Sequence, residues 1–378
     1  MNVRPAPPTV LILYVSIGDG HRRAARAIED AILRRHPEIR TASVDVFELY
    51  NPLLVSLLLG AYRRLSRSFP RFWNRLYDND SVRGRVEDPL NRFYRRASRR
   101  LERLLGRHDP AAIVCTQAIP CGLAAAWKRS SGRRLPLVAV PTDYAVHSYW
   151  LHPEVDLYLV PAEANRVSLI ERGIAPERVR AAGIPIDPGF AVPVDPAASR
   201  RRRGLPADLP AVLLMGGGEG TAGLDRLVRE IDLRRESLQM IALTGRNRFL
   251  RRRLEALRPA LRHPLAVFGF LDSVDDLMSA ADLIVTKPGG LTTAEALARR
   301  LPMILVSPLP GQEEINAAFL EAKGAALRAG SGREASALVG MVLNGSGARE
   351  RMRAAMEVLR RPDSAGTAAD LAAGMARA

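Results

Sequence analysis

The sequence predicts an α/β protein with two doubly wound domains, and three observations support this fold class. The chain has 378 residues, which is more than one typical core organises and suits two domains of roughly 150–200 residues. Short apolar runs alternate with helical patterns, as is typical of parallel sheets covered on both faces. Residues 183–206, GIPIDPGFAVPVDPAASRRRRGLP, interrupt this alternation with several prolines.

The two series of apolar runs predict the strands in order. In the first series, helical spacing between the runs also predicts distinct helices. Strands are expected at 9–16, 41–47, 111–116, 135–140, 156–160 and 179–182, with helices at 22–35, 120–129 and 163–172. The second series predicts strands at 211–215, 238–244, 265–268, 282–286 and 303–306. We therefore expect domains at 1–190 and 191–360, facing each other across a cleft, and a helix at 361–378 that packs back on the first domain.

Composition excludes several classes of protein. The longest apolar run, Leu53 to Ala61, is about half the roughly 20 residues of a membrane span. The N-terminus does not resemble a signal peptide, so we expect a cytoplasmic protein, soluble or peripheral to the membrane. Cys115 and Cys121 lack metal-ligand spacing and are expected to be core thiols. Three histidines carry no motif and are expected at the surface: His36, His108 and His263.

The net charge of +16 is concentrated in one region. Residues 61–107 hold 14 Arg against 5 Asp plus Glu, and seven aromatic residues are interleaved with them. Either these helices pack on a sheet with solvated arginines, or their apolar faces enter a membrane surface while the guanidinium groups meet anionic lipid. The arginine runs at 200–203 and 251–253 fit an ordinary charged surface. An RNA-binding protein would also be basic, but no nucleic-acid motif is present.

The stretch SIGDGHRRAARAI follows the first strand and opens a helix. It is not a Walker loop, because Gly20 is followed by His21 and not by Lys-Ser/Thr. It is not a dinucleotide fingerprint either, because Arg23 stands where a third glycine is needed. Asp19 adds a negative charge that disfavours direct contact with a diphosphate at this turn.

The stretch TKPGGLTTAEAL follows a buried strand and predicts a helix opened by Thr292, with Glu295 in its first turn. A helix N-terminus suits a diphosphate, and a carboxylate displaced to its side can accept ribose hydroxyls. An ordinary capped helix with a dipole-stabilising Glu is the alternative. After the next strand, Gln312, Glu313 and Asn316 begin another helix and offer polar groups for a hexose.

Taken together, the motifs resemble one family of enzymes. Six motifs appear in the order typical of the monogalactosyldiacylglycerol synthases and processive diacylglycerol glucosyltransferases, which are related to the lipid II-forming transferase. They are SIGDGHRRAARAI, PTDYAVHSYWLHPEVDLYLV, GIPIDPGF, LLMGGGEG, VTKPGGLTTAEAL and SPLPGQEEINAAF. The resemblance implies the GT-B fold and inverting transfer from a UDP-sugar to a lipid at the membrane face. The turn at Gly18 to His21 would then serve the acceptor and the chemistry.

The resemblance also implies the site residues. Donor residues are expected to be Gly216, Gly217, Gly218, Phe270, Lys287, Pro288, Gly289, Gly290, Thr292, Glu295, Gln312, Glu313 and Asn316. Acceptor residues are expected to be Gly18, Gly20, His147 and Trp150, and membrane residues Phe72, Trp73, Arg63, Arg64, Arg67 and Arg71. Two residues are candidates for the general base, His21 and Asp143. The helix N-terminus can stabilise the leaving UDP, so we expect no cofactor and no metal in the chemistry.

The expected activity is transfer of glucose or galactose from a UDP-sugar to diacylglycerol on the cytoplasmic face of the membrane, with no nucleic-acid partner. The sequence does not identify the hexose. The enzymatic alternative is N-acetylglucosamine transfer to a polyprenyl-linked peptidoglycan precursor. A UDP-N-acetylglucosamine epimerase shares the architecture, but residues 50–107 and the Pro-Gly-Gln-Glu continuation argue against it.

Overall fold

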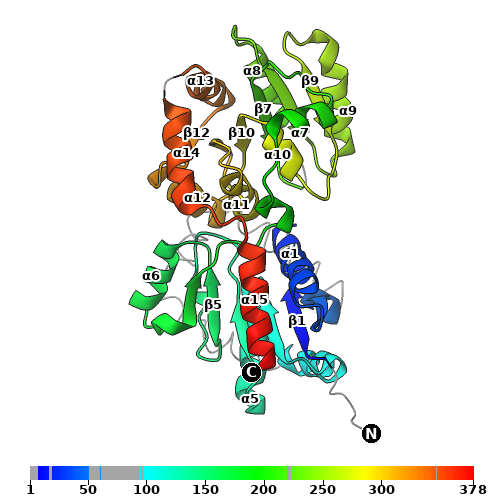
Figure 1. The fold of residues 1–378 in the computed structure, drawn as a ribbon, viewed down its shortest axis with the longest axis vertical. Coiled ribbons are helices and arrows are strands. Elements are labelled where there is room, and N and C mark those ends of the chain that lie inside the picture. Colours follow the sequence, from blue (N-terminus) through cyan, green and yellow to red (C-terminus); the bar gives the residue numbers. More distant parts are fainter. Residues whose placement is uncertain are drawn as a thin grey trace. The chain divides into compact units, whose positions relative to one another are not determined.

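A computed structural model describes residues 7–16, 19–50, 60, 94, 97–218, 223–345 and 347–378 (Figure 1). The chain forms two compact units. Unit 1 comprises residues 1–188, 310–312 and 363–378, and unit 2 comprises residues 189–309 and 313–362. Several residues with expected roles lie outside the described residues: Gly18, Arg63, Arg64, Arg67, Arg71, Phe72 and Trp73.

In its described part, unit 1 is built on a parallel six-stranded sheet with strand order β2-β1-β3-β4-β5-β6. The strands are β1 (Thr9–Tyr14), β2 (Arg40–Asp45), β3 (Ala112–Cys115), β4 (Leu137–Ala139), β5 (Leu157–Val160) and β6 (Val179–Ala181). The helices are α1 (Gly20–Arg35), α5 (Ala118–Ser131), α6 (Glu163–Glu171) and α15 (Ser364–Arg377), and a further helix covers 97–108. Short 3₁₀ turns are η1 (Val46–Leu49), η2 (Ser148–Trp150), η3 (Pro176–Arg178) and η4 (Pro188–Ala191).

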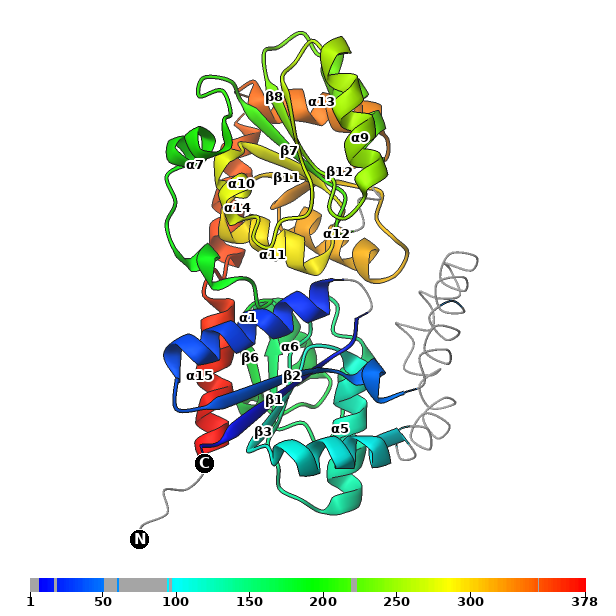
Figure 2. The ribbon, with the colours of Figure 1, turned by 90° about the vertical axis from the view of Figure 1, so that its right-hand side faces the viewer.

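Helices cover both faces of the unit 1 sheet, and accordingly its central strands β1, β3, β4 and β5 are apolar on both sides. Val10 and Ile12 of β1 pack in a core with α1 and α15, which lie side by side (Figure 2). Leu11 and Leu13 point to the other face, where the core includes residues of α5 and of the helix at 97–108. The chain's last helix therefore completes unit 1.

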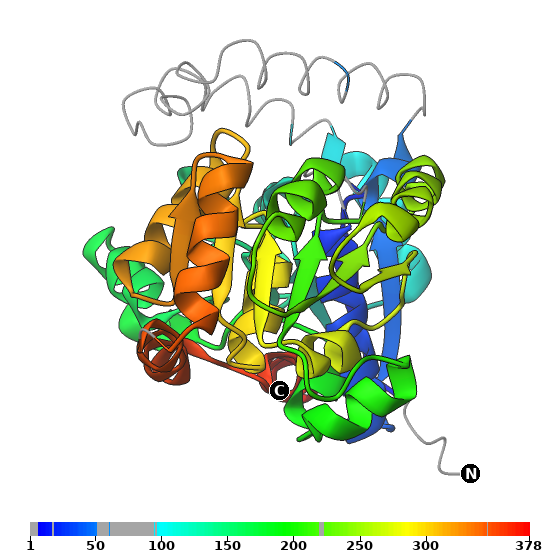
Figure 3. The same cartoon turned by 90° about the horizontal axis from the view of Figure 1, so that it is seen from above.

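In its described part, unit 2 is also built on a parallel six-stranded sheet, with strand order β12-β11-β10-β7-β8-β9 (Figure 3). The strands are β7 (Ala211–Met215), β8 (Gln239–Leu243), β9 (Leu265–Phe268), β10 (Leu283–Thr286), β11 (Met303–Val306) and β12 (Ala326–Ala329). The helices are α7 (Pro196–Arg203), α8 (Leu224–Asp232), α9 (Arg248–Leu257), η5 (Arg258–Ala260), α10 (Asp275–Ala280), α11 (Gly290–Ala298), α12 (Gln312–Ala322), α13 (Gly332–Leu343) and α14 (Ala348–Leu359). The predicted doubly wound α/β class is thus confirmed for both units.

Each sheet reverses its winding direction at one place. In unit 1 the reversal lies between β1 and β3, and in unit 2 between β7 and β10. In open α/β sheets, ligands bind outside the carboxyl ends of the strands at such a switch point. Met215 is paired with Thr286, so the turns after β7 and β10 start at the same level of the sheet.

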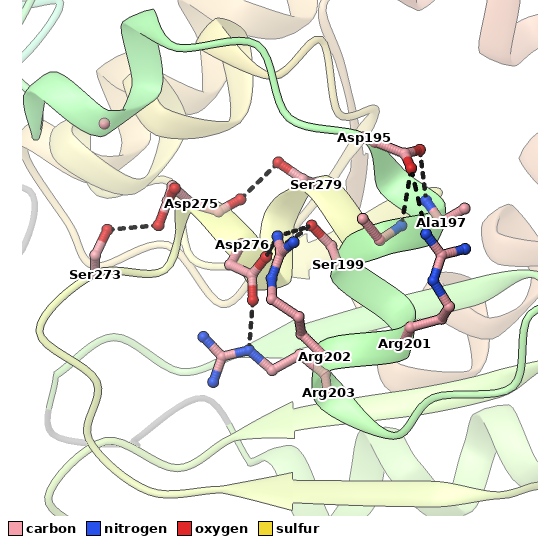
Figure 4. A network of polar contacts seen from close by, with 12 residues as sticks. Asp195, Ala197, Ser199, Arg201, Arg202, Arg203, Ser273, Asp275, Asp276 and Ser279 are labelled. Carbon is pink, nitrogen blue, oxygen red and sulfur yellow. Dashed lines mark hydrogen bonds and ion pairs between the residues drawn. The ribbon is translucent and has the colours of Figure 1, made fainter.

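The arginine run at 200–203 is not the simple charged surface that we expected. Asp195 caps α7 at its N-terminus, and Asp276 of α10 accepts hydrogen bonds from Ser199, Arg202 and Arg203 (Figure 4). Burial acts to raise the pKa of Asp276, but these donors hold it below its usual value. Arginines of this segment therefore hold α7 against α10 through their contacts with Asp276.

Two further expectations were incomplete or wrong. Strand β12 was not predicted, because Arg328 interrupts a run of only four residues. His263 is only 8% exposed and not at the surface, because its Nε2 donates to the Glu236 carbonyl at 2.8 Å. Among the described residues, no helix is long and apolar enough to cross a bilayer.

Candidate active site

His21 lies at the switch point of unit 1, in the first turn of α1. Its Nδ1 is 3.0 Å from the carbonyl oxygen of Thr116, directly after β3, and 2.9 Å from Oγ1 of Thr142, beyond β4. The Thr116 hydroxyl donates in turn to the His21 carbonyl at 3.0 Å. A carbonyl only accepts, so Nδ1 carries the hydrogen and Nε2 keeps its lone pair.

Burial lowers the pKa of His21 to about 4, and the hydrogen bond to the Thr116 carbonyl opposes this shift only in part. The imidazole is therefore neutral at pH 7, as a proton acceptor must be. Burial also lowers the pKa of His147 to about 3, and the positive charge of Arg172 acts in the same direction, as does that of His21 whenever His21 is protonated. The two imidazoles thus belong to one electrostatic environment.

Asp143, the other candidate base, directly follows Thr142, so the structure brings both candidates to one end of the sheet. Asp143 is half-buried. Trp150 is 3% exposed and packs in the core with its ring 6.4 Å from that of His147, so it shapes the wall behind His147. Gly20 faces open space, since an added Cβ would meet nothing within 4 Å.

The negative charge that we expected at the turn before α1 is balanced locally. Arg22 lies one turn further along α1, and its guanidinium donates to Asp19 Oδ1 at 2.9 Å. Asp19 occupies the N-cap position of α1 without a side-chain capping bond. The pair reduces the repulsion that Asp19 would exert on an anionic group near this turn.

In unit 2 the glycine turn after β7 packs tightly against the turn after β8. Gly245 has φ +57°, and a Cβ there would lie 2.3 Å from the Gly218 carbonyl oxygen. The same oxygen accepts the backbone N–H of Arg246 at 3.0 Å. The Arg246 guanidinium stacks on the Phe270 ring, 4.0 Å from its centroid, and Phe270 is 40% exposed. Gly216 to Gly218 and Phe270 thus share one end of the sheet.

Helix α11 begins at Gly290, with Gly289 at its N-cap and no side-chain cap, so the backbone amides of its first turn carry no capping side chain. The expectation that Thr292 opens this helix was wrong, and Glu295 consequently lies in the second turn, where it is 1% exposed. The helix thus begins two residues earlier than expected, and Gly289 before it has an extended backbone. Thr292 is half-buried.

The residues expected to meet the hexose hold the turns around α11 in place. Asn316 is fully buried and its amide donates to the Pro288 carbonyl at 3.0 Å. Glu313 accepts the Leu309 N–H at 2.6 Å. Burial raises the pKa of Glu313, and this hydrogen bond and the charge of Lys287 oppose the shift. Gln312 is half-buried at the start of α12.

Sequence reasoning missed the residues that orient the others. Thr116 and Thr142 fix His21, and Gly245 and Arg246 brace the glycine turn. Thr116 is the last residue of a predicted strand and the others closely follow the ends of predicted strands, which was the available signal. Among the described residues, no three His, Cys, Asp or Glu side chains are grouped to hold a metal ion.

The described end of the basic aromatic region packs on the protein. Tyr94 is 4% exposed, and its ring lies against Gly122 of α5, where an added Cβ would be 2.6 Å from Cζ. Leu101, Leu104 and Leu105 are buried in the same core, while the arginines of this helix are exposed. This part follows the first of our two interpretations, a helix packed on the sheet with solvated arginines.

Comparison with known proteins identifies the family. The monogalactosyldiacylglycerol (MGDG) synthase model matches residues 21–186, and the glycosyltransferase family 28 C-terminal domain matches residues 211–352. The chain is 30% identical to the processive diacylglycerol beta-glucosyltransferase of Bacillus mycoides over 96% of this chain and 92% of that protein. The chain belongs to the processive diacylglycerol β-glucosyltransferase family. The resemblance of its motifs to this family is thereby confirmed.

Other relatives extend this assignment. The glucosyltransferase of the same name from Bacillus subtilis is 30% identical over 84% of this chain and 82% of its own length. Among solved structures, Acinetobacter baumannii MurG superposes with a TM-score of 0.62 at 16% identity, covering 97% of this chain and 99% of its own. That likeness concerns the fold alone, and it confirms the predicted GT-B fold for this member of the diacylglycerol glucosyltransferase family.

Proposed function

We propose that this protein transfers glucose, with inversion, from UDP-glucose to the free hydroxyl of diacylglycerol. The observation that carries the proposal is the 30% sequence identity to the processive diacylglycerol beta-glucosyltransferase of Bacillus mycoides, over 92% of the length of that enzyme. The names of these curated relatives favour glucose, whereas the family model that matches residues 21–186 is named for a monogalactosyldiacylglycerol synthase. Both names favour diacylglycerol over the peptidoglycan precursor as acceptor. A β-linked product from an α-linked donor requires inversion at the anomeric carbon.

The chemistry is a single displacement. The acceptor oxygen forms a bond to the anomeric carbon while the bond from that carbon to the phosphate oxygen breaks. The hydroxyl proton passes to the general base, and UDP departs with the bonding electron pair. His21 suits the base because the Thr116 carbonyl holds its hydrogen on Nδ1, which leaves a lone pair on Nε2, and because its lowered pKa keeps the ring neutral at pH 7. Asp143 remains the other candidate, and His147 would adjoin the acceptor.

The donor would bind at the carboxyl ends of the strands of unit 2. Backbone amides at Gly289, Gly290 and Thr292 would receive the diphosphate, and the helix dipole would stabilise charge on the leaving group. Glu295 would accept the ribose hydroxyls. Phe270, stacked by Arg246, would offer an exposed ring to the uracil. The hexose would lie among four polar residues, which would either contact it or position the turns that contact it: Lys287, Gln312, Glu313 and Asn316.

The acceptor is a membrane lipid, so we propose that the protein works at the cytoplasmic face of the membrane as a peripheral protein. The arginines and aromatic residues between 61 and 93 would meet anionic headgroups. The chemistry we propose uses neither a metal nor a nucleic-acid partner.

Incubation with labelled UDP-glucose or UDP-galactose and diacylglycerol, followed by chromatography of the lipids, tests the function. We expect a labelled glycolipid from UDP-glucose and much less from UDP-galactose. A parallel reaction with UDP-N-acetylglucosamine and a polyprenyl-linked peptidoglycan precursor should give no product. Transfer in that reaction, with none to diacylglycerol, would overturn the proposal.

A further inference from the structure

Arg299 is a buried arginine of unit 2 that the proposed donor site does not use. It caps the C-terminal end of α11, and its side chain is 10% exposed. Burial lowers the pKa of its guanidinium, and the charge of Asp275 opposes this shift. Asp275 is 3.6 Å away and also accepts the Ser273 hydroxyl at 2.8 Å (Figure 4). A charge withdrawn from water beside only a distant carboxylate must gain from its other contacts.

Those contacts are with residues 189–192, the segment by which the chain enters unit 2. The Arg299 guanidinium donates to the Gly189 carbonyl at 3.0 Å and to the Val192 carbonyl at 2.8 Å. It also lies over the ring of Phe190, which is buried, at 5.1 Å from the ring centroid. A single side chain thus holds this entry segment against the end of α11.

The segment by which the chain leaves unit 2 ends beside the same arginine. Helix α14 packs against α11, and Glu357 of α14 pairs with Arg300 at 3.2 Å. Arg360, directly after α14, is close enough for its charge to contribute to the lowered pKa of Arg299. Apart from the short turn at 310–312, the chain passes between the units at 188–189 and 362–363. Both crossings therefore lie within a few residues of contacts with the C-terminal end of α11.

The N-terminal end of α11 is where the diphosphate would bind. With nine residues and a length of about 13 Å, the helix reaches from the proposed donor site to the contacts with both connecting segments. Its buried face, which includes Leu291 and Leu297, holds it in unit 2, so donor binding does not depend on Arg299. Transfer does depend on the connections, because His21 belongs to unit 1 and a small misplacement of reacting groups costs a large factor in rate.

We propose that Arg299 is a positioning residue for the transfer reaction. By holding the entry segment on α11, it fixes the point at which unit 1 is attached to the helix that holds the donor. This inference rests on the proposed function, which assigns the donor to α11 and the base to unit 1. The residue type suits the task, because the planar fork of a guanidinium can donate to two carbonyls and lie over an aromatic ring, whereas the compact ammonium of lysine cannot do both.

Arg299→Met tests the proposal, because methionine keeps an unbranched apolar stem and removes the hydrogen bonds of the guanidinium. The matched control is Arg200→Met. The Arg200 side chain is 14% exposed and donates to the Ala207 and Ala280 carbonyls at 2.7 and 2.9 Å, away from α11 and the entry segment.

We expect Arg299→Met to lower turnover of UDP-glucose with diacylglycerol about tenfold or more and to leave the UDP dissociation constant unchanged. Arg200→Met should lose a similar free energy of unfolding in urea and keep its turnover. Arg299→Lys keeps the charge and can still donate to a carbonyl, so it should recover part of the turnover.

Hydrogen exchange followed by mass spectrometry tests the contact itself without an activity assay. The Gly189 carbonyl also accepts the Val192 N–H at 3.2 Å, within the turn that Arg299 holds. Exchange in a peptide that covers Val192 should therefore be faster in Arg299→Met than in the wild type, and unchanged in Arg200→Met.

Several results would overturn the proposal. Normal turnover in Arg299→Met is one, and unchanged exchange at Val192 is another. An equal loss of turnover in the two methionine variants would show that Arg299 acts only through stability. A loss of UDP affinity that accounts for the whole loss of activity would place its effect in the donor site. If the wild type forms no glucosylated diacylglycerol, the proposed function fails, and exchange at Val192 still decides whether Arg299 fixes the entry segment.

Discussion

At the scale of single residues, the Thr116 carbonyl decides which nitrogen of His21 is available for chemistry. It lies 3.0 Å from Nδ1 and can only accept, so Nε2 is left with the lone pair. The motif around His21 could be found in the sequence, but its orientation could not, because Thr116 lies 95 positions away in the chain. The backbone carbonyl that orients His21 carries no motif of its own.

His21→Ala should lower turnover by about 10² to 10⁴, the usual contribution of a general base, and leave the UDP dissociation constant unchanged. Steady-state kinetics and calorimetry measure the two quantities. His108→Ala, which removes a histidine without a proposed role, is the control. Near-normal turnover in His21→Ala together with a large loss in Asp143→Asn would transfer the role to Asp143.

The lowered pKa values of His21, about 4, and His147, about 3, make stability depend on pH. An unfolded histidine titrates near 6.5, so below that pH the unfolded chain binds more protons than the folded one. The free energy of unfolding should therefore fall as pH drops from about 6.5 toward 4. Urea titrations at pH 7 and pH 5 should show a smaller loss for His21→Asn/His147→Asn than for the wild type. An identical loss would contradict these pKa values.

Glu295→Ala should weaken UDP binding by roughly ten- to a hundredfold, since a hydrogen bond to a charged group typically contributes about 1.5–3 kcal/mol. Glu295→Gln keeps the shape of this buried side chain and should also weaken binding. Glu321→Ala, on the exposed surface of α12, should not. Unchanged calorimetric affinity in both Glu295 variants would exclude the ribose contact.

At the scale of elements, the predicted strands were found because parallel strands buried on both faces are continuous apolar runs. Strand β12 and helix α7 were missed for physical reasons: Arg328 breaks a short run, and α7 is an arginine-rich segment without an apolar stripe. Its stability depends on the Asp195 cap and on Asp276, which is distant in the chain. Local pattern could not show that pairing.

The contact between the turns after β7 and β8 can be tested with two glycines. Gly132 and Gly245 both have positive φ, +66° and +57°, so alanine should cost about 1–2 kcal/mol of unfolding free energy at either position. Only at Gly245 would the Cβ meet a carbonyl oxygen, at 2.3 Å, whereas at Gly132 nothing lies within 4 Å. Gly245→Ala should therefore cost more by urea denaturation and also weaken UDP binding. Equal costs would show that the turns can separate freely.

At the scale of the whole molecule, the sequence predicted two doubly wound sheets and a chemistry that needs both, a base in unit 1 and a donor site in unit 2. The motifs follow the carboxyl ends of strands, and those after β1, β7 and β10 lie beside the two switch points. The sequence could not decide between packing on the sheet and contact with a membrane for the basic region, since leucines, aromatics and arginines would serve either. Tyr94, buried against Gly122, shows that its last part is packed.

We expect the protein to sediment with anionic vesicles and to be partly released by salt, because each basic residue near an anionic surface contributes on the order of 1 kcal/mol, screened over roughly 8 Å. Binding to anionic vesicles should be reduced in the variant Phe72→Ser/Trp73→Ser. It should also be reduced when glutamate replaces Arg63, Arg64, Arg67, Arg71 and Arg75. Equal sedimentation with neutral and anionic vesicles, or no effect of either set, would contradict this docking.

The anomeric configuration of the lipid product tests the central claim most directly. The purified protein is incubated with UDP-α-glucose and diacylglycerol, and the glycolipid is examined by proton NMR at the anomeric position. A single displacement assisted by a base such as His21 predicts a β-glucosyl linkage to the free glycerol hydroxyl. An α-linked glycolipid, or consumption of UDP-glucose without any glycolipid, would contradict inverting transfer to diacylglycerol.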